Sequence, residues 1–375
     1  MNTKKLAVVI GRFAPVHKYH IKSLLARAAK YDHVIVLLGS ANKALNQKNP
    51  FMPEFRASMI RAALRDHGVD VSKFTFVPLK DYPYSNNRWV LQVQKIVDQC
   101  KENLRTCTPN EWETVLVGVD KDDTTFYLKL FPQWKSDVIA PEFSANATDI
   151  RKAMFENNLE SVRDLLPEST FEDLKLWMTQ PTFARLQREY EAEKRSRTCL
   201  AFIGPDGKPL KDEKGEVKVA PYKPIAYCTD NVVTWRGHVL LIRRRSEPGK
   251  GLWALPGGHL NPSEWVKECA VRELQEETHI YFYKDGDKKR KLYLNPDWCK
   301  SSHQFDYPGR SQNGRKITTA YHWVIPDEFE VAVQADDDAD RAQWFSFYDV
   351  LEKMDYDLFE DHQSIIAHMI LGPSL

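Results

Sequence analysis

The sequence GHLNPSEWVKECAVRELQEETHI, from Gly258 to Ile280, decides the fold of the C-terminal half of the chain. Within it, Glu273, Glu276 and Glu277 are spaced i, i+3 and i+4, and a helix places side chains with this spacing on one face. Their carboxylate oxygens are hard ligands of the kind that Mg²⁺ and Mn²⁺ prefer. A charged surface helix is the alternative interpretation of these three residues taken alone.

Residues upstream of the glutamates favour a functional interpretation. Five residues separate Gly258 from Glu264, and seven separate Glu264 from Arg272. A surface helix explains neither this spacing nor the preceding loop Leu255-Pro256-Gly257-Gly258. The stretch resembles the Nudix box at every specified position except that His279 replaces the usual glycine. We expect His279 to adopt a left-handed conformation at the end of the helix, at a modest cost in stability.

The Nudix resemblance implies a metal-dependent hydrolase of diphosphates, folded as an α/β/α sandwich with a mixed sheet. Water is a weak nucleophile at neutral pH, and a divalent ion that bridges the phosphates lowers the pKa of bound water. The resemblance implies that Glu273, Glu276 and Glu277 are catalytic and bind Mg²⁺ or Mn²⁺. Glu264 is expected as a further metal ligand, and also as an ion-pair partner of Arg272 that orients the ligands.

The N-terminal half starts with a buried strand, Leu6 to Ile10, followed by the loop GRFAPVHKYH from Gly11 to His20. A helix from about Tyr19 to Lys30 and a second strand, His33 to Leu38, complete a strand–helix–strand pattern typical of a parallel sheet. Glycine lets the backbone approach a ligand closely, and the start of a helix offers free N–H groups to phosphates. The loop therefore predicts a phosphate-binding site.

His17 and His20 are three residues apart, and the loop has no serine, cysteine or carboxylate nucleophile. A phosphate that attacks the α-phosphate of a nucleoside triphosphate is already an anion, so catalysis reduces to positioning and charge neutralisation. Two ordinary surface or capping histidines are the alternative. With Gly-x-Phe-x-Pro before them, they resemble the signature of the nucleotidylyltransferase superfamily, whose usual form is His-x-Gly-His. Tyr19 stands where the glycine is expected.

A second block, Ser144 to Arg151, resembles the Ser/Thr-x-Ile-Arg motif of the same superfamily. The resemblance implies that Thr148 and Arg151 bind the triphosphate and that Arg151 is catalytic together with His17 and His20. A helix cap formed by Thr148 beside a solvated arginine is the alternative. The ATP-binding residues implied in this way are Gly11, Arg12, Phe13, His17, His20, Thr148 and Arg151.

Further residues resemble one branch of the superfamily, the archaeal-type nicotinamide-mononucleotide adenylyltransferases. They are Asn49-Pro50-Phe51 with Arg56, Asp81, Trp89, and Gly118-Val119-Asp120-Lys121-Asp122. The resemblance implies that Arg56, Asp81 and Trp89 bind nicotinamide mononucleotide, and a cationic nicotinamide ring favours an aromatic face such as that of Trp89. A core tryptophan in an amphipathic helix is the alternative for Trp89.

Substrate clues for the second half lie outside the Nudix box. Pro296 falls sixteen positions after Ile280, a spacing that resembles the Nudix subgroup acting on ADP-ribose. The segments Phe305 to Arg310 and Gly314 to Thr318 resemble the same subgroup. A turn proline is the alternative interpretation of Pro296.

Composition limits the class of protein. The 375 residues include 53 basic and 52 acidic ones, and the net charge of +1 argues against a nucleic-acid partner or an anionic membrane surface. No apolar run approaches the length of a membrane span, and the N-terminus does not resemble a signal peptide. The six cysteines include no Cys-x-x-Cys pair, which favours a reducing cytoplasm. A homo-oligomer is compatible with this composition.

The order of the two halves resembles the bifunctional nicotinamide-mononucleotide adenylyltransferase/Nudix hydrolases. We therefore expect a Rossmann-like domain over residues 1–182, a charged helix and linker over 183–218, and a Nudix domain over 219–375. The implied substrates are ATP and nicotinamide mononucleotide in the first domain and ADP-ribose in the second. Two alternatives remain open: a transferase and a Nudix hydrolase for other substrates, and a nucleotide-sensing regulator with one inactive domain.

Overall fold

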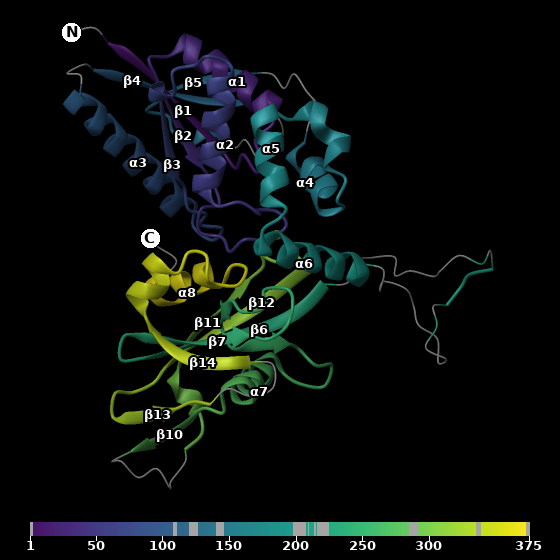
Figure 1. Cartoon of the computed structure of the whole chain (residues 1–375). Helices are drawn as coiled ribbons and strands as arrows, with labels where there is room; N and C mark the ends of the chain where they lie inside the picture. The colour runs from purple at the N-terminus through teal and green to yellow at the C-terminus, as the bar shows by residue number, and fades with distance from the viewer. Residues whose placement is uncertain are drawn as a thin grey trace. The chain divides into compact units, whose positions relative to one another are not determined.

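A computed structural model of the chain describes residues 3–107, 111–119, 127–139, 146–197, 208, 210–213, 215, 225–284, 292–334 and 339–372. The chain divides into two compact units, Met1–Gln187 and Arg188–Leu375 (Figure 1). Helix α6 (Pro181–Arg197) runs through this division, and residue 182, the predicted end of the first domain, lies within the first turn of that helix.

The first unit is built on a five-stranded parallel sheet in the order β3-β2-β1-β4-β5. Its strands are β1 (Lys4–Gly11), β2 (His33–Leu38), β3 (Phe74–Pro78), β4 (Trp112–Val119) and β5 (Lys135–Ile139). The predicted Rossmann-like parallel sheet is confirmed. Strand β5 ends at Ile139, and residues 140–145 lie outside the described residues.

Alternate residues of these strands pack against different layers, because successive side chains of a strand point to opposite faces. Leu6, Val8 and Leu116 belong to a core cluster with Val93 and Val97 of helix α3 (Asn86–Cys107). Helices α1 (Lys18–Lys30) and α2 (Pro53–Asp66) contact each other and β2 on the other face (Figure 1). The sheet is thus buried on both sides.

Two separate helices lie within residues 168–197. Helix α5 (Glu168–Trp177) ends in a turn at residues 178–180, and α6 begins at Pro181. Proline lacks an N–H and fixes φ, so it starts a helix more readily than it continues one. A shorter helix, α4 (Ala147–Phe155), precedes them.

The second unit is built on a mixed sheet in the order β11-β12-β6-β7-β14, with β8 paired to β7 and β9 paired to β6. Strand β12 runs parallel to β6, whereas its other neighbour β11 is antiparallel. A separate hairpin pairs β10 with β13. The strands are β6 (Ile225–Trp235), β7 (His238–Arg244), β8 (Trp253–Ala254), β9 (Gly257–His259), β10 (Tyr281–Lys284), β11 (Cys299–Phe305), β12 (Arg315–Val324), β13 (Phe329–Ala332) and β14 (Ala339–Ser346).

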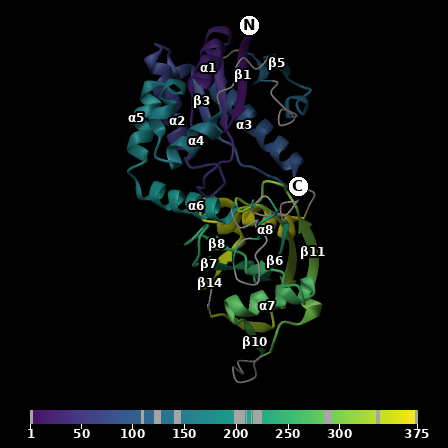
Figure 2. The same ribbon diagram turned by 90° about the vertical axis from the view of Figure 1, so that its right-hand side faces the viewer.

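Helices α7 (Val266–Thr278) and α8 (His362–Leu371) lie on opposite faces of this sheet (Figures 1 and 2). Helix α7 contacts β6, β9 and β14, and α8 contacts β11 and β12. The predicted α/β/α sandwich with a mixed sheet is confirmed. In the described part of the chain, no helix combines the length and the apolar content that a membrane span needs.

Candidate active sites

The loop after β1 folds back on itself at Gly11. Phe13 has φ of 50°, in the left-handed region, which returns its ring over the strand end. A Cβ atom added to Gly11 would lie 2.8 Å from that ring. Glycine at this position therefore allows the aromatic ring to close the turn that leads into α1.

His17 and His20 are brought together at the start of α1. His17 is the N-cap residue of α1, and its backbone N–H donates to His20 Nδ1 at 3.3 Å. The two imidazole rings stack, with centroids 3.6 Å apart and planes 21° from parallel, and the Phe13 ring lies 4.8 Å from His20. The predicted pair thus stands at the N-terminal end of α1, the kind of position at which backbone amides bind phosphates, and the phosphate site stays a prediction.

Arg56 lies beneath this loop instead of facing solvent. Its side chain is 2% exposed, and its Nη1 donates to the carbonyl oxygens of Arg12 and Gly39 at 2.6 and 2.8 Å. These bonds join the loops that follow β1 and β2. The contacts assign Arg56 a role in holding the loop, and its contact with nicotinamide mononucleotide stays a prediction.

Arg151 joins α4 to the same loop. Its Nη1 donates to the carbonyl oxygen of Ala14 at 2.6 Å, and its Nη2 donates to Thr148 Oγ1 at 3.1 Å. Burial lowers the pKa of Arg151 to about 10, and the nearby guanidinium of Arg12 adds to the decrease. Asn146, not Thr148, caps α4, because its side chain accepts from the Thr148 N–H. The exposed Thr148 hydroxyl therefore orients Arg151.

Asp81 and Trp89 lie on the segment that follows β3. Asp81 accepts from the backbone N–H and the hydroxyl of Ser40, at 3.1 and 2.7 Å, which ties it to the loop after β2. Trp89 is half-buried near the start of α3, with its ring 6.1 Å from that of Phe131. This contact fits the core interpretation of Trp89, and ring stacking on a substrate stays a prediction. Residues 120–122, 144 and 145 of the quoted motifs lie outside the described residues.

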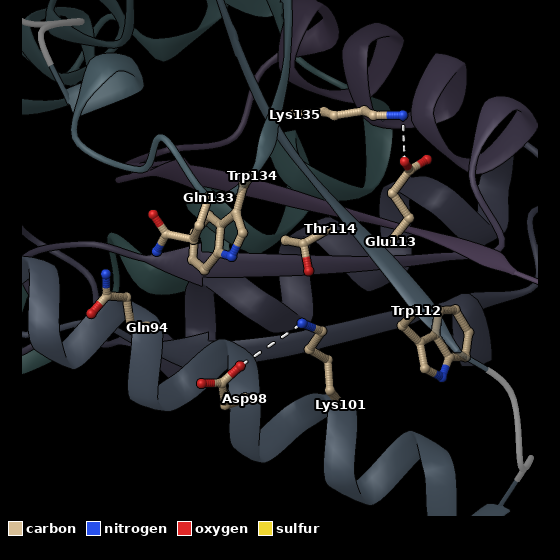
Figure 3. A pocket seen from close by; sticks show the side chains of 9 residues that line it. All are labelled: Gln94, Asp98, Lys101, Trp112, Glu113, Thr114, Gln133, Trp134 and Lys135. Carbon is tan, nitrogen blue, oxygen red and sulfur yellow. Dashed lines mark ion pairs between the residues drawn. The ribbon is translucent and has the colours of Figure 1, made fainter.

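A cavity of about 610 Å³ lies between α3 and the first residues of β4 and β5, and none of the predicted site residues lines it (Figure 3). Two ion pairs, Asp98–Lys101 and Glu113–Lys135, belong to its wall. Ligands of open parallel sheets bind beyond the carboxyl ends of the strands, whereas this cavity is at their amino ends. It is therefore separate from the predicted nucleotide site. Its lining residues are Gln94, Asp98, Lys101, Trp112, Glu113, Thr114, Gln133, Trp134 and Lys135.

In the second unit, the adjacent glycines Gly257 and Gly258 lie against two glutamates of the Nudix box. A Cβ atom at Gly258 would overlap the carboxylate of Glu273, which would then have to move. The backbone N–H of Gly257 donates to Glu277 Oε2 at 2.8 Å. Helix α7 and the preceding loop are thus locked together through the predicted metal ligands.

Arg272 is the centre of an ion-pair network. Its Nε and Nη2 donate to both oxygens of Glu264, at 2.9 and 2.7 Å. Its Nη1 donates to Glu273 and Glu276, at 2.8 Å each. The predicted ion pair of Glu264 with Arg272 is confirmed.

Glu264 has its acceptor oxygens engaged within the protein. Besides Arg272, the Asn261 N–H donates to its Oε1 at 2.8 Å. The bonds from Arg272 and then from Asn261 lower the pKa of Glu264 to about 2. Both oxygens of Glu264 are used in this way, and its role as a metal ligand stays a prediction, as for the other predicted ligands Glu273, Glu276 and Glu277.

Glu277 is 9% exposed, and burial raises the pKa of its carboxyl to about 8. The negative charges of Glu273 and Asp230 contribute to the increase. Burial also raises the pKa of Glu273, although Arg272 opposes the shift. A divalent cation would offset this concentration of negative charge, and its preferred ligands are oxygens of this type. The chemistry of these oxygen donors therefore suits such an ion.

Among the described residues, no group of three or more His, Cys, Asp or Glu side chains is gathered closely enough to hold a metal ion. Two of the predicted ligands, Glu273 and Glu276, form ion pairs with Arg272 Nη1. Binding of a metal by these glutamates would require that they give up at least part of those contacts. The three-glutamate metal site therefore stays a prediction.

His279 ends α7 in the conformation that the sequence predicts. Its φ and ψ are 42° and 37°, in the left-handed region, and its N–H donates to the Gln275 carbonyl at 2.9 Å. A glycine adopts this conformation without the strain that Cβ introduces. His279 therefore keeps the geometry of the missing glycine.

Asn231 is a residue of this site that the sequence analysis missed. It is fully buried in β6, and its Nδ2 donates to the carbonyl oxygens of Pro256 and Ala270, at 3.1 and 2.8 Å. It thereby joins the Nudix loop to helix α7. An amide side chain in the middle of a central strand, directly before Val232 and Val233, is the signal that could have revealed it, since a buried polar group needs partners.

The segment that resembles the ADP-ribose subgroup places its arginine in the interior. Arg310 is 5% exposed and forms two hydrogen bonds with Asp361, at 3.0 and 3.1 Å. A substrate contact for Arg310 would have to replace this buried ion pair. Pro296 begins a short 3-10 helix, Pro296–Trp298, which fits the turn interpretation.

Comparison with known proteins defines the class of both halves. Residues 8–153 match the Cytidylyltransferase-like family, and residues 229–369 match the NUDIX domain family. The first unit is thus a nucleotidylyltransferase domain, and the second is a Nudix domain.

Relatives identify the family more closely. The chain is 33% identical over 187 residues to a nicotinamide/nicotinic acid mononucleotide adenylyltransferase of Acinetobacter baylyi, covering 50% of this chain and 93% of that protein. It is also 33% identical to a nicotinamide-nucleotide adenylyltransferase of Pyrococcus furiosus, over 46% of this chain and 83% of that protein. The chain belongs to the nicotinamide-mononucleotide adenylyltransferase family, with a Nudix domain in its second half.

Two crystal structures from Francisella tularensis resemble both halves at once. They are of a bifunctional NMN adenylyltransferase/ADP ribose pyrophosphatase, one of them complexed with AMP and a manganese ion. The complex is 26% identical to this chain, with a TM-score of 0.80 over 98% of this chain and 99% of that one. The second structure is 27% identical, with the same TM-score, over 99% and 100% of the two chains.

Proposed function

We propose that the first unit transfers an adenylyl group from ATP to nicotinamide mononucleotide, giving NAD and diphosphate, and that the second hydrolyses ADP-ribose to AMP and ribose 5-phosphate. The likeness to the Francisella tularensis bifunctional enzyme carries this proposal, because it extends over 98% of the chain and therefore over both motifs in the same order.

The stacked histidines suit the adenylyl transfer. The phosphate of the mononucleotide is the nucleophile and needs no base, so the site must hold two anions in line and neutralise the charge that develops between them. In the proposal, His17 and His20 donate to the phosphates of ATP beside the first amides of α1. Arg151, held by Ala14 and Thr148, lies across the loop and adds positive charge.

The glutamates of α7 suit the hydrolysis. When bound, Mg²⁺ or Mn²⁺ would bridge the diphosphate and lower the pKa of the attacking water. Glu273, Glu276 and Glu277 would hold this ion. Arg272 and Glu264 orient two of these ligands, and Gly257 fixes the third through its N–H.

Product analysis by mass spectrometry tests both parts of the proposal. ATP with nicotinamide mononucleotide and Mg²⁺ is expected to give NAD and diphosphate. ADP-ribose with Mg²⁺ or Mn²⁺ is expected to give AMP and ribose 5-phosphate. A panel of other phosphomonoesters and other dinucleotides serves as the control. Absence of NAD, or preference for another dinucleotide, would contradict the corresponding half.

A further inference from the structure

A cluster of buried charged side chains lies between the mixed sheet and the start of α8. Arg310 donates to both carboxylate oxygens of Asp361, and its Nη2 lies 3.7 Å from Asp230 Oδ2. Asp230 also accepts from the Thr318 hydroxyl at 2.7 Å. Buried ion pairs contribute little to stability when compared with apolar residues of the same size. A contribution to stability therefore does not explain this cluster, and we consider which backbone and side chains it holds in position.

His362 connects this cluster to the Nudix loop. Its Nδ1 accepts from the backbone N–H of Leu255 at 2.8 Å, so Nε2 carries the ring proton of the neutral imidazole. Nε2 faces Asp230 Oδ1 at 3.9 Å. Burial lowers the pKa of His362, which keeps the ring neutral and keeps Nδ1 an acceptor.

Three consecutive residues of the loop are therefore each held by a different side chain. The Leu255 N–H is bound by His362, the Pro256 carbonyl by Asn231, and the Gly257 N–H by Glu277. The sheet and α7 provide two of these partners. The third comes from the first residue of α8, more than eighty residues after the Nudix box.

The cluster fixes the position of His362. Asp361 immediately precedes it and is bound by two bonds from Arg310. The neighbouring Glu360 accepts from the Gln312 N–H at 3.2 Å, so the loop that carries Arg310 holds the start of α8 at two points. Displacement of this helix start would withdraw the acceptor from Leu255.

We propose that His362 is a positioning residue of the hydrolase site, which holds the Nudix loop through Leu255 and thereby holds the metal-binding glutamates. This inference rests on the proposed hydrolase function. The link runs through two residues of the loop, since Gly257 is bonded to Glu277 and Gly258 packs against Glu273. Residues that support metal ligands in this way typically change metal affinity or activity by about 10- to 100-fold when replaced.

Two substitutions of His362 distinguish the contact made by its Nδ1, with the Leu255 N–H, from that made by its Nε2, with Asp230. In His362→Asn, the amide oxygen can occupy the place of Nδ1 and accept from Leu255. In His362→Gln, the longer amide reaches toward Asp230 and leaves the place of Nδ1 without an acceptor. Both side chains are polar and of similar size. His368→Phe is the matched control, because His368 lies on the same helix and contacts His303 and Phe305 instead.

The measurements are the kcat and KM of ADP-ribose hydrolysis, Mn²⁺ affinity by electron paramagnetic resonance, and hydrogen exchange of the Leu255 amide. His362→Gln is expected to lower kcat or Mn²⁺ affinity by about 10- to 100-fold, leave KM within about 3-fold, and speed Leu255 exchange. His362→Asn and His368→Phe are expected to stay within about 3-fold of the wild type.

Equal effects of the Asn and Gln substitutions would overturn the inference, and so would unfolding of the second unit in both variants, because His362 would then serve stability alone. If the wild type does not hydrolyse ADP-ribose, the proposed function fails instead. Mn²⁺ affinity and Leu255 exchange still test the role of His362 in that case.

Discussion

The backbone N–H of Gly257 donates to the buried carboxyl of Glu277, which joins the loop before the Nudix helix to the helix itself. Burial makes the charged form of this carboxyl unfavourable. Burial raises the pKa of Glu277 from 4.5 to about 8 in the metal-free protein. The folded state therefore binds a proton more tightly than the unfolded state does. Stability that is fully present below pH 4.5 is lost as the pH rises to about 8.

Glu277→Gln removes this titration and retains an acceptor for Gly257. Without metal, we expect the variant to be more stable than the wild type at pH 9, by about 1–3 kcal/mol, and the difference to vanish near pH 4.5. Urea unfolding in the presence of a chelator, followed by hydrogen exchange of peptides from residues 225–372, measures this difference. A difference that is the same at both pH values would contradict the assignment.

Addition of Mg²⁺ is expected to reverse the order of stability. The ion offsets the charge of Glu277 and binds the folded state, so a concentration 100 times the dissociation constant would stabilise the wild type by about 2.7 kcal/mol. The Gln variant lacks this ligand charge and gains less. Equal stabilisation of both proteins would remove Glu277 from the proposed set of metal ligands.

The two proposed activities are predicted to be separable by a single substitution. Glu276→Gln removes a proposed metal ligand that also accepts from Arg272, and we expect ADP-ribose hydrolysis to fall by at least about 100-fold. NAD synthesis, which depends on His17 and His20 in the other unit, is expected to stay unchanged. Steady-state assays of both reactions on the same preparation measure the effect.

Glu268→Gln is the matched control for this substitution. It removes one negative charge from the same helix, and its amide oxygen can still accept from the N-cap residue Trp265, as Glu268 does at 2.9 Å. Hydrolysis by this control should remain within about 3-fold of the wild type, because an exposed helix charge contributes only tenths of a kcal/mol. If Glu276→Gln abolished both activities, the model of two independent sites would be wrong.

The parts of the site that the sequence could predict are those held on one helix or one loop. His17 and His20, and likewise Glu273 and Glu277, lie within one helical turn of each other, so their spacing alone brings them to one side. Asn231 and His362 reach the Nudix loop from distant parts of the chain. Their contacts depend on how the sheet and α8 pack, which no local pattern encodes.

Arg56 shows a different reason for incomplete prediction. The resemblance to archaeal-type adenylyltransferases implies a ligand contact for Arg56, and the structure shows that its guanidinium donates to two backbone carbonyls under the loop. Charge complementarity and satisfaction of buried carbonyl groups both favour an arginine at such a position. The sequence contains no signal that distinguishes an arginine that binds a ligand from one that binds buried carbonyl groups. The strands and helices, by contrast, could be predicted directly from apolar periodicity.

The left-handed His279 is predicted to carry a cost in stability. Glycine has no Cβ and adopts φ of 42° without strain, so His279→Gly is expected to stabilise the second unit by up to about 1 kcal/mol. His279→Ala is the control, because it keeps the Cβ and loses the Nδ1 contact with the Gln275 carbonyl, and it should destabilise. Urea unfolding of both variants gives the comparison. A loss of stability in the glycine variant would show that the Nδ1 contact outweighs the backbone strain.

Trp89 allows its two interpretations to be separated. If its ring stacks on the nicotinamide, Trp89→Leu should raise the KM for nicotinamide mononucleotide by about 3- to 30-fold, which corresponds to a cation–π interaction of about 0.5–2 kcal/mol. The KM for ATP should change by less than about 2-fold. If Trp89 serves only the core with Phe131, stability should fall and both KM values should stay unchanged.

Val93→Ala shows what a loss of core packing alone does. Val93 lies four residues after Trp89 on α3, is fully buried, and belongs to the core cluster against which Trp89 packs. We expect it to lower the free energy of unfolding of the first unit by about 1–3 kcal/mol and to leave both KM values unchanged. A selective increase in the KM for the mononucleotide in Trp89→Leu alone would then assign the ring to the substrate. The same increase in both variants would instead show that α3 acts through its packing, since Val93 has no polar group or aromatic ring to offer a nucleotide.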